Sequence, residues 1–180
     1  MTRSDDSIEV LFVDDEPDLP DLVATKLEEA DDRLSVVTAR TVEAGMDEVE
    51  TRDIDCIVAD YDLPKRDGID FLESVREDHP RLPFILYTGK GSEGVASDAI
   101  SKGVTDYFQK GRVPNQYEIL ANRIANAVAA ERARQAMAAQ QRELQTHERL
   151  VHSMLESACI YGRDQHFVLV NEYLAEWYGK

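Results

Sequence analysis

Five short apolar runs, separated by stretches with helical periodicity, constrain the fold of this chain more than any other feature. The runs cover residues 8–13, 34–39, 54–59, 83–88 and 104–109. Runs of this length are typical of buried parallel strands, and the helical stretches supply the crossovers that parallel strands need. We therefore predict an α/β fold, a right-handed doubly wound sheet of five parallel strands with helices on both faces.

Polar residues stand where four of these runs end. Asp14 and Asp15 follow the first run, Asp60 follows the third, Thr88 ends the fourth, and Lys110 comes directly after the fifth. Open α/β sheets bind ligands outside the carboxyl ends of their strands. These side chains, which are far apart in the sequence, are therefore expected to converge at one edge of the sheet.

The chemistry of this set favours a divalent cation and a phosphoryl group. Mg²⁺ prefers oxygen ligands and takes one or two carboxylates together with phosphate oxygens. A carboxylate can also attack phosphorus and form an aspartyl phosphate. Lys110 can neutralise charge on the transferred group, and the Thr88 hydroxyl can donate a hydrogen bond to one of its oxygens.

The chain is strongly acidic, because 36 Asp and Glu residues stand against 20 Lys and Arg residues and give a formal net charge of -16. Such a chain repels nucleic acid and anionic lipid, so we expect direct binding to neither. Two interpretations of the acidity stay open. It provides either a solvated surface with strong self-repulsion or an adaptation to a cytoplasm of high salt.

Cysteine use and the amino terminus both favour a cytoplasmic protein. Cys56 and Cys159 lack metal-site spacing and suggest no disulfide framework, which fits a reducing compartment. The first residues have no hydrophobic targeting region, and no run is long enough to span a membrane. We expect no membrane association.

A long helical pattern starts at Pro114 and continues without Gly or Pro until Gly162. Its first part is expected to pack on the sheet through Tyr117, Leu120, Ile124, Ala127 and Val128. Further on, Met137, Leu144 and Val151 recur every seven residues, which is a weak heptad pattern. Two alternatives remain: an exposed single helix, or a helix that pairs with a second copy in a homodimer.

The last stretch changes character. Residues 159–164 and 166–171 predict two short strands around a turn, and residues 172–178 predict the start of a helix. A hairpin and half a helix cannot bury a core alone, so this stretch is expected to begin a second domain. The sequence does not say whether Lys180 is a natural end. Within the first domain, residues 62–68 predict a turn that closes with Asp67-Gly68.

In this order, the residues at the strand ends resemble the receiver domain of two-component response regulators over residues 7–128. The resemblance is carried by Asp14-Asp15, Asp60 with Asp62-Leu63-Pro64 and Asp67-Gly68, Thr88-Gly89, and Asp106-Tyr107-Phe108-Gln109-Lys110. It implies a flavodoxin-like (βα)5 fold. It also implies a signalling protein that catalyses only its own phosphoryl transfer and autodephosphorylation, with a sensor histidine kinase or a phosphotransfer protein as partner.

The resemblance implies a role for each acidic residue. Asp60 would be the phosphoacceptor. Asp15 and Asp60 would bind Mg²⁺ directly, Asp14 would hold a metal-bound water, and the backbone carbonyl of Asp62 would complete the protein ligands.

It also implies how the phosphoryl group would be sensed. Thr88 and Lys110 would contact that group, and Tyr107 would be an aromatic switch that turns inward when Thr88 moves. The chain departs from the family at one position, because receivers usually have proline directly after the lysine and this chain has Gly111. That departure puts the rigidity of the loop and the placement of Lys110 in question.

The carboxy-terminal stretch resembles the start of a PAS sensory domain through Gly162-Arg163-Asp164, Val168-Leu169-Val170-Asn171 and Trp177-Tyr178-Gly179. The predicted organisation is therefore a receiver over residues 7–128, a helical linker capable of forming a coiled coil over 129–157, and an incomplete PAS-like segment over 158–180. Most of a PAS fold, including its usual ligand pocket, would lie beyond Lys180.

Two other functions remain as alternatives. The first is a phosphatase or phosphotransferase that forms an aspartyl intermediate on a small substrate, which Asp60-Tyr61-Asp62 superficially fits. That scheme leaves Asp14-Asp15 without a role, and the chain lacks a cap domain and further acids late in the sequence. The second is an interaction module whose acids bind metal but in which Asp60 is never phosphorylated.

Overall fold

The computed structural model describes residues 6–89, 93–111, 115–153, 159–161 and 167–170, in two compact units, residues 1–132 and 133–180. Strands and helices alternate along the first unit. They are β1 (Ile8–Val13), α1 (Leu19–Ala30), β2 (Leu34–Ala39), α2 (Val42–Thr51), β3 (Cys56–Ala59), α3 (Gly68–Asp78), β4 (Phe84–Thr88), α4 (Glu93–Ser101), β5 (Asp106–Gln109) and the start of α5 (Gln116–Ser153). All five predicted strands are confirmed.

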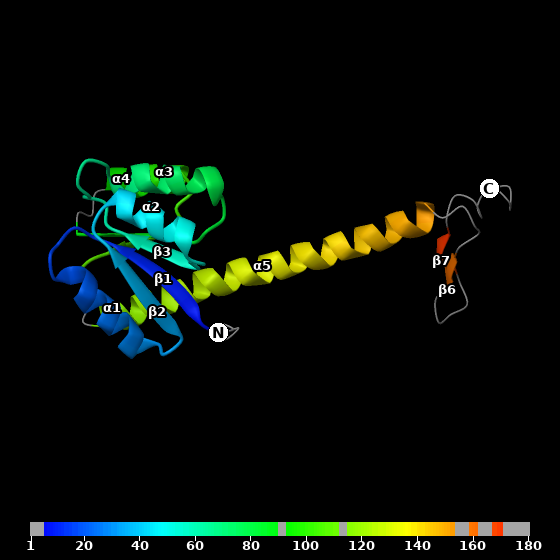
Figure 1. Ribbon diagram of the computed structural model, residues 1–180, viewed down its shortest axis with the longest axis horizontal. Coiled ribbons are helices and arrows are strands. Elements are labelled where there is room, and N and C mark those ends of the chain that lie inside the picture. Colours follow the sequence, from blue (N-terminus) through cyan, green and yellow to red (C-terminus); the bar gives the residue numbers. More distant parts are fainter. Residues whose placement is uncertain (1–5, 90–92, 112–114, 154–158, 162–166, 171–180) are drawn as a thin grey trace. The chain divides into compact units, whose positions relative to one another are not determined.

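The five strands form one parallel sheet in the order β2-β1-β3-β4-β5. Helices α1 and α5 cover one face of this sheet, and α2, α3 and α4 cover the other (Figure 1). The predicted doubly wound fold is therefore confirmed. Strands β1 and β3 are neighbours at the centre, and their register pairs Val13 with Ala59. The residues that follow, Asp14 and Asp60, therefore start at the same level of the sheet.

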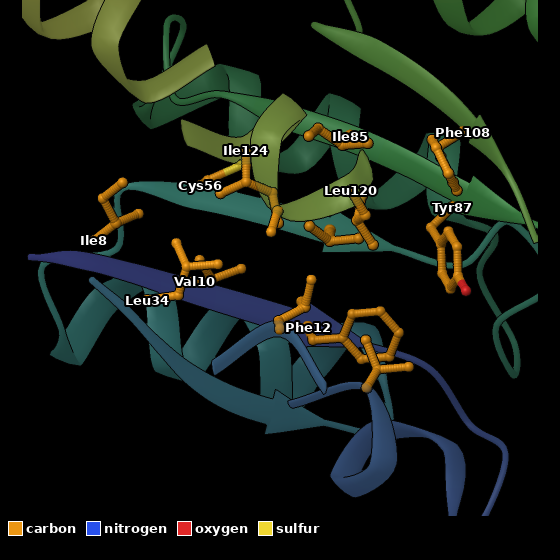
Figure 2. Packing of buried hydrophobic residues seen from close by; sticks show 14 of the residues in the cluster. Ile8, Val10, Phe12, Leu34, Cys56, Ile85, Tyr87, Phe108, Leu120 and Ile124 are labelled. Atoms are coloured by element: carbon orange, nitrogen blue, oxygen red, sulfur yellow. The ribbon is translucent and has the colours of Figure 1, made fainter. Parts of the chain in front are cut away.

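A hydrophobic core fills the space on each face of the sheet. Successive side chains of a strand point to opposite faces, so these strands contribute to both cores. Figure 2 shows the core under α1 and α5, where Leu120 and Ile124 reach strand residues such as Val10 and Ile85. Leu120, Ile124 and Val128 are buried as predicted, whereas Tyr117 is only partly buried at the edge of this core.

Hydrogen bonds also hold helix α5 at the amino ends of β1 and β3. The guanidinium of Arg132 donates hydrogen bonds to the Ser7 carbonyl (2.7 Å) and to Asp55 Oδ1 (3.1 Å). The other Asp55 oxygen accepts the backbone N–H of Glu9 at 2.8 Å. These contacts hold the helix against the starts of β1 and β3.

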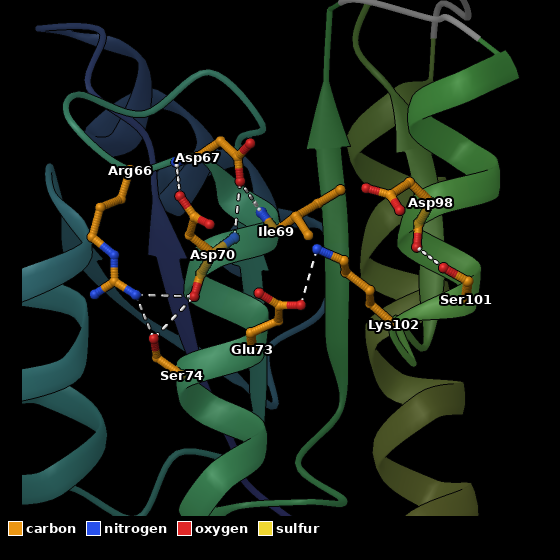
Figure 3. A network of polar contacts seen from close by, with 9 residues as sticks. All are labelled: Arg66, Asp67, Ile69, Asp70, Glu73, Ser74, Asp98, Ser101 and Lys102. Carbon is orange, nitrogen blue, oxygen red and sulfur yellow. Dashed lines mark hydrogen bonds and ion pairs between the residues drawn. The ribbon is translucent and has the colours of Figure 1, made fainter.

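Helix α3 starts at a cap that the sequence does not predict. Asp67 Oδ1 accepts the backbone N–H groups of Ile69 (2.9 Å) and Asp70 (2.8 Å), and Asp70 Oδ2 accepts the N–H of Asp67 (3.2 Å) (Figure 3). This reciprocal arrangement is a capping box. The Asp67-Gly68 pair therefore begins a helix instead of merely closing a turn. Across the same face, Lys102 pairs with Glu73 at 2.9 Å and links α4 to α3.

The second unit contains the rest of α5 and a hairpin. Strands β6 (Cys159–Tyr161) and β7 (Phe167–Val170) pair antiparallel, which confirms the two predicted strands. The predicted helix over 172–178 lies outside the described residues, and nothing in the described part of this unit identifies a PAS domain. The Met137 and Leu144 side chains are 70% and 60% exposed. Among the described helices, none is both long and apolar enough to cross a bilayer.

Candidate functional site

The carboxyl ends of four strands bring the predicted site residues to one edge of the sheet. Asp14, Asp15 and Asp60 each offer a carboxylate oxygen, and these oxygens lie within 4.8 Å of one another. Lys110 reaches the same place from the end of β5, with its Nζ 2.6 Å from Asp14 Oδ2 and 3.1 Å from Asp60 Oδ2. The register of β4 and β5 pairs Thr88 with Gln109, which places Lys110 one residue beyond Thr88.

Backbone hydrogen bonds fix the two central carboxylates. The Asp60 N–H donates to the Val13 carbonyl at 2.8 Å, and the Asp14 N–H donates to the Ala39 carbonyl at 3.1 Å. Their side chains are held as well, because Asp60 Oδ1 accepts the N–H of Tyr61 at 2.8 Å and Asp14 Oδ1 accepts the N–H of Glu16 at 3.0 Å. Asp60 therefore keeps one oxygen on the backbone and turns the other to Lys110.

Burial and charge act in opposite directions at this site. Burial raises the pKa of the Asp60 carboxyl, and the nearby Lys110 ammonium only partly offsets this effect. For Lys110, burial lowers the pKa, but the hydrogen bond to Asp14 and the charge of Asp60 outweigh it, so the pKa is raised. Lys110 therefore stays an ammonium, and it is the charge that offsets the buried acids.

The acidic residues of the site differ in their exposure to solvent. Asp14 and Asp60 are buried, while Asp15 is exposed at the rim of the cluster. Three carboxylates at this spacing repel one another unless a cation lies among them, and their hard oxygens suit Mg²⁺. The side chain of Asp62 is exposed in the loop after β3, and the role expected of its backbone carbonyl stays a prediction.

Gly68, the first residue of α3, packs directly behind Asp60. A Cβ at this position would lie 2.3 Å from the Asp60 carbonyl oxygen and 2.9 Å from Leu86 Cδ1. The Gly68 N–H donates to the Tyr61 carbonyl at 2.8 Å. Only glycine allows this close approach of helix and strand end, so Gly68 helps to set the position of Asp60.

The two residues expected to act as a switch lie on neighbouring strands. Thr88 is fully buried at the end of β4, and its carbonyl accepts the Lys110 N–H at 2.9 Å. Tyr107 in β5 is half-buried and borders the core formed with α2, α3 and α4. These positions fit the expected roles, and the movement of Tyr107 stays a prediction.

Sequence reasoning missed Tyr87 as part of the site. Its side chain is 1% exposed, and the Lys110 Nζ lies 5.4 Å from the centre of its ring, within the range of a cation–π interaction. The ring stacks on Phe108 with centroids 5.9 Å apart, as the close-up of this core shows (Figure 2). In the sequence Tyr87 is one more residue of an apolar strand, and only its place beside Thr88 hints at the site.

Replacing Tyr87 with phenylalanine is expected to make the protein more resistant to alkali. Burial, and then Tyr117 and the acids of the site, raise the pKa of Tyr87 above its ordinary value near 10. Its contribution to stability is therefore complete below about pH 10 and is lost as pH rises through the raised pKa. Urea unfolding from about pH 9 to 12 should show a steeper loss for the wild type than for Tyr87→Phe. A Tyr61→Phe control should follow the wild type, and parallel curves for all three would contradict this prediction.

Comparison with known proteins agrees with this geometry. Residues 10–125 match the response regulator receiver domain family. A receiver domain protein from Clostridium thermocellum superposes with a TM-score of 0.62 at 27% identity, covering 70% of this chain and 98% of that one. These matches place the parallel sheet, with its acids and lysine at one edge, in the class of receiver domains. This chain belongs to the response regulator receiver domain family.

Curated relatives are regulators of which this chain spans only a part. The nitrogen assimilation regulatory protein NtrX of Azorhizobium caulinodans is 35% identical over 104 residues, which are 57% of this chain and 22% of that protein. The bacterioopsin transcriptional activator of Halobacterium salinarum is 32% identical over 151 residues, 84% of this chain and 21% of the relative. The chain therefore spans about a fifth of the length of these two relatives.

Proposed function

We propose that this chain is a phosphoacceptor receiver in a two-component phosphorelay and that Asp60 takes up the phosphoryl group. The observation that carries the proposal is the Asp60 carboxylate. It accepts the backbone N–H of Tyr61, lies 3.1 Å from the Lys110 ammonium and shares a cluster with Asp14 and Asp15. A sensor histidine kinase or a phosphotransfer protein is the proposed donor, because a receiver draws its phosphoryl group from such a partner.

The residues divide the chemistry of transfer among them. An Asp60 oxygen attacks phosphorus, so that an O–P bond forms while the P–N bond of a phosphohistidine breaks and the imidazole leaves. Lys110 neutralises charge on the transferred group, and the Thr88 hydroxyl donates a hydrogen bond to one of its oxygens. Asp14, Asp15, Asp60 and the Asp62 carbonyl would hold Mg²⁺, which supplies charge neutralisation for the attacking and transferred oxygens.

Phosphorylation would change the surface near α5. The added charge competes for Lys110, which is bonded to Asp14 at 2.6 Å before transfer. Movement of Thr88 and Tyr107 would then alter the face formed by α4, β5 and α5. Helix α5 is the proposed output, through pairing of its exposed Met137 and Leu144 in a homodimer. If the protein sediments as a monomer both before and after phosphorylation, the proposed pairing is refuted.

The segment over residues 158–180 is proposed to begin a PAS-like sensory domain. The β6–β7 hairpin is compatible with such a start, and the likeness to the Halobacterium salinarum relative extends over 151 residues, more than a receiver alone spans. Expression of a longer chain that extends past Lys180 would test this assignment. A prolonged chain that gains no further strands by circular dichroism would refute it.

The proposed function is tested by phosphoryl uptake. The purified chain is incubated with acetyl phosphate, once with Mg²⁺ and once with a chelator, and its intact mass is measured. We expect one phosphoryl group, stable to acid and labile to base, with Mg²⁺ and none with the chelator. No uptake from either acetyl phosphate or a phosphorylated kinase, while Mg²⁺ still binds, would favour an interaction module. Repeated turnover of a phosphate ester would favour an enzyme.

The acidity leads to a further prediction, about salt. A formal net charge of -16 makes the folded chain repel itself, and salt shortens the reach of that repulsion from about 10 Å at 0.1 M to about 3 Å at 1 M. The free energy of unfolding in urea should therefore rise as KCl is added up to about 1 M. Urea is the suitable denaturant because it carries no charge. A fall in stability over this range would contradict this prediction and would count against an adaptation to a salt-rich cytoplasm.

A further inference from the structure

The residue that follows Lys110 has a backbone geometry that proline cannot adopt. Gly111 has a φ of +73°, in the left-handed region, and its N–H donates to the side-chain Oε1 of Gln116 at 2.7 Å. Proline fixes φ near −65° and has no N–H to donate. Gly111 stands where receivers usually have proline, so in this chain a different contact holds the residue after Lys110.

This contact joins the residue after Lys110 to the first residue of α5. On its other side Lys110 is bound to β4, because its own N–H donates to the Thr88 carbonyl at 2.9 Å. The Lys110 backbone is therefore held between the sheet and the helix. Its side chain starts from this held position to reach Asp14 at 2.6 Å and Asp60 at 3.1 Å.

Crowding does not explain the glycine. A Cβ added at Gly111 would meet nothing within 4 Å, so the constraint at this position comes from the backbone angle and from the N–H. Helix α5 is in turn anchored by Leu120 and Ile124, which are fully buried in the core below the sheet. Gln116 thus projects from a rigid helix and can restrict the movement of Gly111 through this hydrogen bond.

We propose that Gln116 is a positioning residue for phosphoryl transfer, which fixes the Lys110 ammonium at the acceptor site through the Gly111 N–H. The inference rests on the proposed function, because Lys110 is assigned there to the phosphoryl group. It extends the site to α5, the helix that is the proposed output, because the first residue of α5 holds the residue that follows Lys110.

The test compares three variants of the full chain with the wild type. Gln116→Ala removes the acceptor oxygen, and Gln116→Glu keeps an oxygen at the same reach. Gln141→Ala makes the same change at an exposed position of the same helix and serves as the matched control. Each protein is measured for the initial rate of phosphoryl uptake from acetyl phosphate with Mg²⁺. NMR of the metal-free proteins gives the exchange rate of the Gly111 amide and the order of the Lys110 side chain.

We expect Gln116→Ala to take up phosphoryl groups about fivefold more slowly, to exchange the Gly111 amide faster and to loosen Lys110, because one ordinary hydrogen bond is lost. Gln116→Glu and Gln141→Ala should resemble the wild type. Unchanged uptake and unchanged Lys110 order in Gln116→Ala would overturn the inference, as would a Gln116→Glu variant that is equally impaired. A wild type that takes up no phosphoryl group from acetyl phosphate or from a phosphorylated kinase would refute the proposed function instead, and the NMR comparison would still decide whether Gln116 positions Lys110.

Discussion

Replacement of Asp60 by asparagine is expected to abolish phosphoryl uptake, with a fall in rate of more than about a thousandfold. The amide is a poor nucleophile, and it also loses the charge that Lys110 meets at 3.1 Å. Intact mass after incubation with acetyl phosphate and Mg²⁺ measures the effect. Asp62→Asn is the matched control, because it changes an exposed acid two residues away and leaves the backbone carbonyl in place. This control should retain most of the uptake.

The competing result would locate the nucleophile elsewhere. If Asp60→Asn gained a phosphoryl group at the wild-type rate, peptide mapping would show whether Asp14 or Asp15 carries it. Both lie close to Asp60, because one carboxylate oxygen from each of the three residues lies within 4.8 Å of the others. Such an outcome would show that Asp60 is not the phosphoacceptor. Asp14 or Asp15 would then be the phosphoacceptor and not only a metal ligand.

Replacement of Gly68 by alanine is expected to damage both the fold and the site. The new Cβ would lie 2.3 Å from the Asp60 carbonyl oxygen, and backbone cannot move away as easily as the end of a side chain. Overpacking of this kind costs about 3 kcal/mol of unfolding free energy. Because Asp60 would shift with its carbonyl, phosphoryl uptake should fall as well. Urea unfolding and the uptake assay measure the two effects.

Gly89→Ala is the matched control for this substitution. Gly89 also lies beside a site residue, since it follows Thr88, but a Cβ there would meet nothing within 4 Å. This variant should unfold within about 1 kcal/mol of the wild type, the usual range for a glycine change without a clash. If Gly68→Ala were as stable and as active as Gly89→Ala, the close approach of α3 to Asp60 would have no role in the site.

Local sequence was sufficient to predict the sheet. The run from Ile8 to Val13 is apolar except for Glu9, which is typical of a strand buried on both faces, and it forms β1 with these bounds. Strands β3, β4 and β5 begin one or two residues later than predicted. The predicted first residues, Ile54, Pro83 and Val104, are apolar but lie before the residues that pair in the sheet, and apolarity alone does not mark where pairing starts.

Local sequence was less informative where one residue has two roles. Asp67-Gly68 carries a strong turn signal, and the pair does follow a loop. The structure shows that Asp67 caps α3 and that Gly68 makes room for the Asp60 carbonyl. The role of Gly68 depends on where α3 meets the end of β3. No sequence pattern within a few residues of Gly68 predicts that contact.

The sequence by itself determined the order of strands and helices and the set of polar residues at the strand ends, because hydrophobic periodicity and residue type are local properties. Tertiary structure alone decided that Tyr87 lies under Lys110, that Gln116 accepts the Gly111 N–H, and that Asp14 and Asp60 share one ammonium. Each of these contacts depends on strand register and on the packing of α3 and α5. Register and packing are set by side chains that meet only after the chain has folded.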